Sequence, residues 1–290
     1  MKKKLLYIII SLFVCTNLWA QEKAEKDEVV MDAFASALLI DNQTSFMPSA
    51  KTLEFVIQHK FGSIQNGRSD LWGIYAPAED IRLGLNYVPV ENVQIGAGIS
   101  RKLMNTDFNL KWNVLKQTTN DRIPFFVTLY GNLAIDGREK DQVDSGMTFS
   151  DRLAYFSQII IGRKFTDALS LQTGISFSHA NLVTENYDHD RVGLHLNGRM
   201  KVSPQGAIIA TFDAPLQIDK LSEQASYIDQ MHPEPTLSFG YEISTYTHVF
   251  SIYMGNSSSI LQQNNMMNNF SKIEKDNFAI GFTITRLWMW

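Results

Sequence analysis

Residues 80–100 read DIRLGLNYVPVENVQIGAGIS. From Asp80 to Tyr87, and again from Asn92 to Ser100, every second residue is apolar, and those between are polar or glycine. A period of two places the apolar residues on one face of a β-strand and the polar residues on the other. The stretch therefore predicts two amphipathic strands, 80–88 and 92–100, joined by a short turn at Val88–Glu91.

The same alternation continues along the chain from Thr52 onward. It predicts twelve strands in all, because ten further ranges show it: 52–61, 106–115, 123–135, 151–165, 169–178, 190–202, 206–212, 235–243, 247–255 and 276–288. Membrane barrels carry an even number of such strands, and each strand gives only a weak hydropathy signal because apolar residues occupy alternate positions.

Short and long connections alternate between these ranges. The short ones are Val88–Glu91, Lys116–Arg122, Thr166–Ala168, Ser203–Gln205 and Ser244–Tyr246, and the long ones are Gly62–Glu79, Asp136–Ser150, His179–His189, Asp213–Glu234 and Asn256–Lys275, with Arg101–Asn105 as a short exception. Short periplasmic turns and long extracellular loops are typical of bacterial outer-membrane barrels, whereas strand alternation alone also suits a soluble sheet. We expect an all-β fold, a monomeric transmembrane antiparallel up-and-down β-barrel of about twelve strands with both termini periplasmic.

Aromatic residues fall near both ends of the predicted strands. One group lies near the periplasmic ends (Tyr87, Phe125, Phe165, Tyr241, Phe250 and Trp288) and a second near the opposite ends (Phe61, Phe108, Phe177 and Phe278). Two aromatic girdles are the usual anchors at the two membrane interfaces. A general preference of aromatic residues for strands explains their number but not this clustering.

The N-terminus has the order of a secretory signal: Lys2–Lys4, an apolar run over Leu5–Val14, and Ala20 before a charged segment. We expect cleavage after Ala20. A lipoprotein signal at Cys15 is the alternative, but it needs a small residue directly before the cysteine, and Val14 occupies that position. The mature chain then has no cysteine, which excludes disulfides and thiolate metal sites. The expected organisation is a signal peptide at 1–20, a periplasmic or plug segment at 21–51 and the barrel at 52–290.

The last strand runs from Asn277 to Arg286 and ends in Leu287-Trp288-Met289-Trp290, like the C-terminal assembly signal of outer-membrane proteins. Together with residues 246–250, Asn256-Ser257, residues 212–216 and the Ala20-Gln21 junction, it resembles an uncharacterised outer-membrane β-barrel family of Bacteroidota, a domain of unknown function. The resemblance implies an outer membrane of a Gram-negative bacterium, outer-membrane lipid around the barrel and the barrel-assembly machinery as a partner. It implies no activity.

The sequence offers little catalytic chemistry. There is no nucleotide-binding glycine motif, the net charge of −4 does not suggest a nucleic-acid partner, and the scattered histidines predict no metal site and no cofactor. Ser178-His179 and the pair His248 and Ser251 differ in strand parity, so their side chains point to opposite faces and cannot form a nucleophile and base. We therefore expect no enzyme, and an outer-membrane hydrolase is the weakest alternative.

The polar faces of the strands predict a charged lumen. Eight basic residues (Lys60, Arg82, Lys111, Arg152, Lys164, Arg191, Arg199 and Lys201) share these faces with His195 and with four acidic residues (Glu54, Asp80, Asp107 and Glu242). An open lumen lined in this way would favour anions. In a narrow barrel the same charges would pair and fill the interior. Twelve strands do not decide between the two.

Two main hypotheses follow for function. The first is a passive channel for small polar or anionic solutes. The second is a closed, non-conducting barrel whose long loops 213–234 and 256–275 serve binding or surface interaction. The segment around Asp32–Ile40 predicts either a short helix or an extended stretch, inserted in the barrel or lying in the periplasm.

Overall fold

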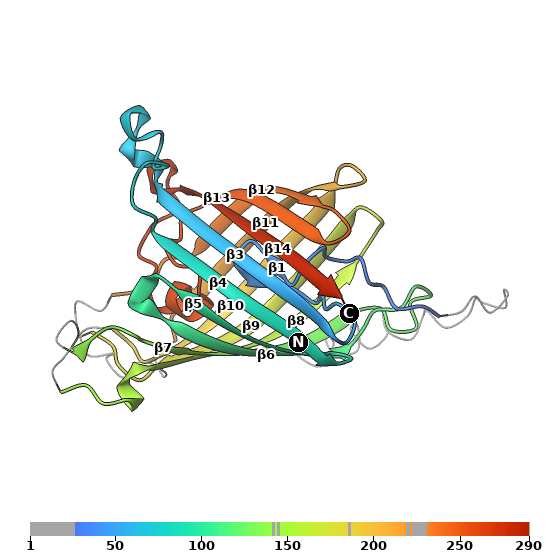
Figure 1. The fold of residues 1–290 in the computed structure, drawn as a ribbon, viewed down its shortest axis with the longest axis horizontal. Helices are drawn as coiled ribbons and strands as arrows, with labels where there is room; N and C mark the ends of the chain where they lie inside the picture. Colours follow the sequence, from blue (N-terminus) through green and yellow to red (C-terminus); the bar gives the residue numbers. More distant parts are fainter. Residues whose placement is uncertain are drawn as a thin grey trace, which may run out of the picture.

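A computed structural model describes residues 27–140, 143, 146–184, 187–218, 221 and 231–289, and the predicted signal peptide lies outside them. Twelve antiparallel strands, paired in chain order, form a barrel that closes where β14 pairs with β3 (Figure 1). The predicted fold class is confirmed. The strands are β3 (Thr52–Ser63), β4 (Asp80–Val90), β5 (Val93–Ser100), β6 (Thr106–Leu115), β7 (Phe126–Ile135), β8 (Leu153–Lys164), β9 (Leu169–Ala180), β10 (Asp190–Lys201), β11 (Gly206–Leu216), β12 (Thr236–Ser244), β13 (His248–Gly255) and β14 (Ala279–Met289).

Each predicted strand overlaps an observed one, and the boundaries differ where the backbone turns. β7 begins three residues later than predicted, because the Thr118 amide donates to the carbonyl of Ile123 and closes a turn. A 3-10 helix over Ser150–Arg152 delays β8 in the same way. β11 runs on to Leu216, beyond the predicted end at 212, because it stays paired with β10 as far as Val192.

The strands expose apolar side chains on the outside and bury polar ones on the inside. In β6, Phe108, Leu110 and Trp112 are about half exposed, whereas Asp107 and Lys111 are 0% exposed. A water-soluble sheet would do the reverse, because leaving a large apolar side chain in water forfeits about 1.5–3 kcal/mol of burial. The outer face therefore suits hydrocarbon, where a closed sheet also leaves no backbone group unpaired.

The connections separate the two ends of the barrel. One end, here the short-turn end, carries residues 91–92, 116–125, 165–168, 202–205 and 245–247, together with both ends of the described chain. The other, the long-loop end, carries the described residues of the connections 64–79, 101–105, 136–140, 143, 146–152, 181–184, 187–189, 217–218, 221, 231–235 and 256–278. The turn over 116–125 is longer than the Lys116–Arg122 expected from the sequence.

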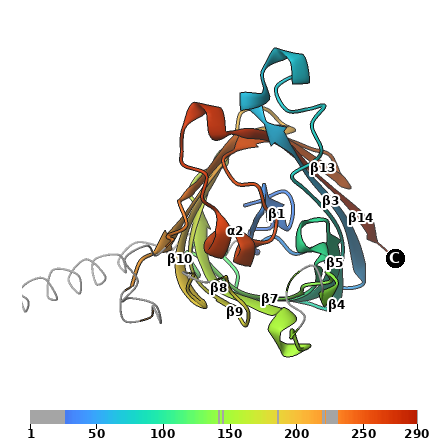
Figure 2. The ribbon, with the colours of Figure 1, turned by 90° about the vertical axis from the view of Figure 1, so that its left-hand side faces the viewer.

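Two segments enter the lumen, one from each end. A small hairpin of β1 (Leu38–Leu39) and β2 (Asn42–Gln43) lies inside the ring of strands, and so does α2 (Gln262–Asn268), as the view from the long-loop end shows (Figure 2). In the part of the chain that the structure describes, no helix is long and apolar enough to cross a membrane.

Leu110→Arg, in the middle of the exposed face of β6, should lower the free energy of unfolding in lipid by about 2–4 kcal/mol, because a guanidinium group would enter hydrocarbon. Val202→Arg, beside a short turn, should cost at most about 1 kcal/mol because the headgroup region hydrates it. Urea titration in phospholipid vesicles, followed by tryptophan fluorescence, measures both. Equal losses for the two variants would contradict the placement of Leu110 near the membrane midplane.

Candidate functional site: the occupied lumen

Residues 33–47, which we call the plug, enter the lumen from the short-turn end and return to it. The Val30 amide donates to Gln117 before the segment enters, and the Lys51 amide donates to Val88 after it leaves. Inside, Thr44 donates to the carbonyl of Ala37 at 3.0 Å and closes the hairpin, whose tip includes Ile40 at φ 60°. Because both ends of the plug leave by the same opening, it is an inserted hairpin and not a thread through the barrel.

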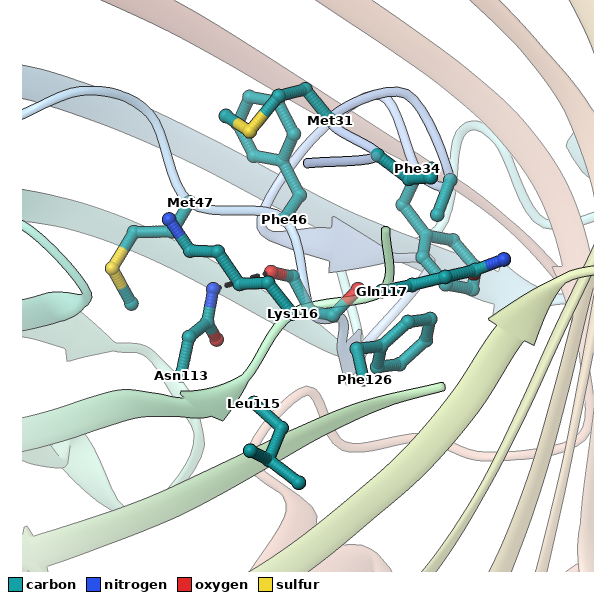
Figure 3. A pocket seen from close by; sticks show the side chains of 12 residues that line it. Met31, Phe34, Phe46, Met47, Asn113, Leu115, Lys116, Gln117 and Phe126 are labelled. Carbon is teal, nitrogen blue, oxygen red and sulfur yellow. Dashed lines mark hydrogen bonds between the residues drawn. The ribbon is translucent and has the colours of Figure 1, made fainter. Parts of the chain in front are cut away.

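At its base the plug packs against Phe126, the first residue of β7. The ring of Phe34 meets that of Phe126 edge to face, with centroids 6.0 Å apart. Met31, Phe34, Phe46, Gln117 and Phe126 are among the residues that line one space between the plug and the wall (Figure 3), and Asn113 donates to the carbonyl of Ser45. The space left among them is about 20 Å³, which is room for about one water molecule. The plug therefore fits the wall closely at this end.

Lys111 holds the backbone of the plug. Its buried ammonium donates to the carbonyls of Phe46 at 3.2 Å, Thr44 at 3.3 Å and Ala37 at 3.5 Å. An ammonium has three N–H donors and is costly to bury without partners, so three carbonyls satisfy it and it orders both arms of the hairpin. Strand parity predicts that Lys111 faces the lumen, but its partners are backbone atoms that no side-chain pattern reveals.

The tip of the plug bonds to the wall in two directions. The Asp41 carboxylate meets Lys60 of β3 at 2.6 Å and accepts from Gln58 at 3.2 Å. The Asn42 amide donates to Asn197 of β10 and Asp213 of β11, both at 2.7 Å. The hairpin is thus held from both sides of the lumen.

Residues 257–268, which we call the inner loop, close the lumen from the long-loop end. Lys60, besides binding Asp41, donates to the carbonyls of Ser257 at 3.2 Å and Ser259 at 2.7 Å. Asp80 accepts from the Ile260 amide at 2.9 Å. Gln262 of α2 donates to the Asp41 carbonyl at 3.2 Å, so plug and inner loop touch. One buried lysine therefore joins the wall, the plug and the loop.

The other inner charges pair along the wall. Arg82 binds Asp107 with two hydrogen bonds of 2.7 and 2.8 Å, and its guanidinium lies over Gly98, where an added Cβ would come within 2.6 Å of it. Glycine at this position therefore leaves space for the Arg82–Asp107 ion pair. Arg199 meets Glu242 at 2.7 Å, and Arg191 meets Asp188 at 2.9 Å. Glu54 accepts from Asn86 at 2.9 Å.

Three of the predicted lumen cations lie at the rims. Lys164 binds Asp32 at 2.9 Å at the short-turn end, and Lys201 lies 3.8 Å from the same carboxylate. Burial opposes the ionisation of Asp32, but Lys164 and Lys201 outweigh it and hold the pKa of that carboxyl below its ordinary value. Arg152, at the long-loop end, donates to the carbonyls of Asp136 and Arg138.

The buried charges are not mainly basic, which corrects the expectation from the sequence. Among the described residues, five buried lysines and arginines (Lys60, Arg82, Lys111, Arg191 and Arg199) face seven buried carboxylates (Asp41, Glu54, Asp80, Asp107, Asp188, Asp213 and Glu242). The sequence count missed Asp41 because the plug has no strand pattern. It missed Asp213 because β11 was expected to end at 212, and Asp188 because it lies in a loop.

One buried hydrogen-bond chain crosses three strands. His195 of β10 is 2.7 Å from Asp213 of β11 through Nδ1 and 2.7 Å from Ser176 of β9 through Nε2. All three side chains face inward and are at most 3% exposed. The pairs weighed from the sequence do not form such a chain: Ser178 faces inward, whereas His179 bonds to Asp190 at the long-loop end. Only the register between strands brings Ser176 to His195.

A larger cavity, of about 280 Å³, lies at the long-loop end. Lys102, Arg152 and Asn264 are among its lining residues, and the Nδ2 of Asn264 is buried with no hydrogen-bond partner. By contrast, the space between the plug tip, Arg82 and Gln262 is about 20 Å³. Across the described ranges, no cluster of three metal-ligating side chains occurs.

Lys111→Met should loosen the plug, because the carbonyls of Thr44 and Phe46 lose the Lys111 donor and that of Ala37 keeps only the Thr44 amide, at a cost of about 1–3 kcal/mol. Hydrogen exchange of the Thr44 amide, which is bonded to Ala37, should become about ten to a hundred times faster, at ~1.4 kcal/mol per factor of ten. Lys272→Met, on an exposed loop, is the matched control and should leave the rate unchanged. An unchanged rate in Lys111→Met would show that the plug does not depend on this cation.

Comparison with known families matches residues 34–288 to the family described as "Membrane bound beta barrel domain" (DUF5777). No curated protein matches the sequence.

Among solved structures, a KdgM porin aligns over 82% of this chain and 99% of its own, with 8% identity and a TM-score of 0.45. An outer membrane channel from Pseudomonas putida F1 aligns over 84% and 97%, with 11% identity and a TM-score of 0.44. These weak structural similarities add nothing to the argument on function. Because the family model covers most of the chain, the protein belongs to this family of membrane-bound β-barrels.

Proposed function

We propose that this protein is an outer-membrane channel of a Gram-negative bacterium, closed in this structure and able to pass small polar solutes when the plug and the inner loop leave the lumen. The observation that carries the proposal is that, among the described residues, each of the two segments that close the lumen is a hairpin or loop that enters and leaves by the same end. Each segment can withdraw without unthreading the chain and without breaking the strand pairing that holds the barrel closed.

The wall behind these segments supports a water-filled state. It is lined by amide side chains, and several of their buried atoms have no hydrogen-bond partner: both polar atoms of Gln94, and one oxygen each of Asn86, Asn109 and Gln172. A buried polar atom left without a partner costs about 1–3 kcal/mol. Water in an open lumen can form hydrogen bonds with these groups, so the wall is suited to hydration.

The charge balance argues against a preference for anions. Withdrawal of the plug removes Asp41 and leaves five buried basic residues and six buried carboxylates among the described residues. Most of them pair with one another along the wall, as Arg82 does with Asp107. We propose that the open lumen passes small polar solutes without favouring anions, in contrast to the expectation from the sequence.

The cavity at the long-loop end favours the second hypothesis, a closed barrel with a binding function. Its volume of about 280 Å³, the Lys102 and Arg152 side chains and the free amide of Asn264 are what a small polar ligand needs. Lys102 donates to Ser258 of the inner loop, so occupancy of this cavity and the position of the loop are linked in either function.

Single-channel recording separates the two functions. The wild-type barrel should stay closed, and replacing residues 36–45 and 258–267 together by glycine-serine linkers of equal length should give steady conductance steps without anion preference. A linker of the same kind in place of residues 65–72, outside the lumen, is the control and should stay closed. A folded double variant that does not conduct would rule out the channel.

The orientation is also part of the proposal: short turns in the periplasm and long loops outside the cell. An epitope inserted after Gly67 should be stained by antibody on intact cells, whereas the same epitope after Pro204 should be stained only after permeabilisation. The reverse staining would overturn the orientation. We further propose that the assembly machinery recognises β14, which ends at Met289, and an origin in Bacteroidota stays a prediction.

A further inference from the structure

The chain from Ser176 through His195 to Asp213 has the connectivity of a serine nucleophile with its base. The carboxylate of Asp213 lies on one nitrogen of the ring and the hydroxyl of Ser176 on the other, each at 2.7 Å. A carboxylate on Nδ1 fixes the tautomer that carries its proton there, which leaves Nε2 free to accept the proton of the serine hydroxyl. The ring is therefore oriented as a base toward Ser176.

The strand register builds this arrangement. His195 pairs directly with Asp213 on β11, and Ser176 pairs with Gly193, two residues before His195 on the same face. Side chains that are diagonal neighbours across two strands lie close enough for long side chains to meet. Gly193 has no side chain that could separate the Ser176 hydroxyl from the ring of His195. A Cβ added to Gly193 would come within 2.7 Å of Oγ of Ser176 and 3.2 Å of Nε2 of His195.

A buried histidine needs two hydrogen-bond partners, so the bonds to Asp213 and Ser176 alone could serve stability. The residues around Ser176 add a second feature, an apolar pocket beside its hydroxyl. The sulfur of Met266, in α2, shares the space above Gly193 with the serine hydroxyl, since the same Cβ would come within 2.5 Å of it. Met266 is fully buried against Tyr130 and Phe156, so the serine borders an apolar pocket that the loop fills.

The side-chain amide of the residue paired with Ser176 is the candidate donor for a developing oxyanion. Gln158 of β8 pairs with Ser176 across the strands, and its Nε2 lies over Gly174, 3.1 Å from where a Cβ of that residue would be. Gly174 in turn pairs with His195. A side-chain amide placed beside the nucleophile is one of the groups that stabilise the tetrahedral intermediate of acyl transfer.

We propose that Ser176 is a latent nucleophile for ester hydrolysis that becomes reactive when the inner loop leaves the lumen. The substrate class is an ester of a short, unbranched acid, because its acyl chain takes the place of the Met266 side chain against Tyr130 and Phe156.

In the reaction, Oγ of Ser176 bonds to the carbonyl carbon while its proton passes to Nε2 of His195. The bond from the carbonyl carbon to the leaving oxygen breaks, and that oxygen takes the proton from His195. Water then attacks the acyl carbon while one of its protons passes to His195. The bond from that carbon to Oγ of Ser176 breaks, the carboxylic acid leaves, and Oγ takes the proton from His195.

The test is covalent labelling of the purified full-length barrel with a fluorophosphonate bearing a short alkyl chain, with the adduct mapped by mass spectrometry. Wild-type protein should label slowly. Met266→Ala should label at Ser176 at least about tenfold faster, because the pocket beside the hydroxyl is cleared, and it should hydrolyse p-nitrophenyl butyrate. Adding Ser176→Ala should abolish the label.

Ser178→Ala in the Met266→Ala background is the matched control, because Ser178 is an inward, buried serine on the same strand without a histidine partner. It should label as its parent does. No adduct at Ser176 in a folded Met266→Ala barrel would overturn the proposal, and so would labelling that persists unchanged after His195→Gln. If Met266→Ala does not fold, a glycine-serine linker over residues 258–267 clears the same pocket. Labelling does not depend on conductance, so the two proposals fail separately.

Discussion

A peptide backbone surrounded by hydrocarbon has to satisfy its hydrogen bonds within the protein, because lipid offers no partner. In this chain the pairing of β14 with β3 meets that constraint by removing the last free edge of the sheet. Closure then divides every strand into two faces. The outer one is apolar, as at Leu110, and the inner one is left with whatever polar groups the alternate positions supply, as at Lys111.

The polar interior creates a second constraint, since buried charges need partners. Along the wall, charges pair across an intervening strand, and Arg82 of β4 reaches Asp107 of β6 because Gly98 of β5 lies between them. At the centre the wall does not supply enough partners. Lys111 and Lys60 are satisfied instead by the carbonyls and the carboxylate of the inserted segments. The two lysines that would line an open lumen are therefore the same ones that bind the segments closing it.

The inner loop connects the two proposals. Through Ser257, Ser259 and Ile260 it is anchored to Lys60 and Asp80, and through Met266 it covers the hydroxyl of Ser176. A movement that opened the lumen would also expose the serine. A ligand in the cavity at the long-loop end, which Asn264 lines, would contact this same loop.

The sequence by itself determined the barrel, its twelve strands and the inward face of residues such as Lys60, Arg82 and Lys111, because a period of two is a local property that each strand shows alone. It failed at strand boundaries such as Phe126 and Leu153, where turns with no apolar pattern take over. Only the tertiary structure decided what those inner residues bind. The partners of Lys111 are backbone carbonyls of the plug, the partner of Lys60 is Asp41, and Ser176 meets His195 across a strand boundary. Such contacts depend on register and on the path of irregular segments, which the order of residues along one strand does not contain.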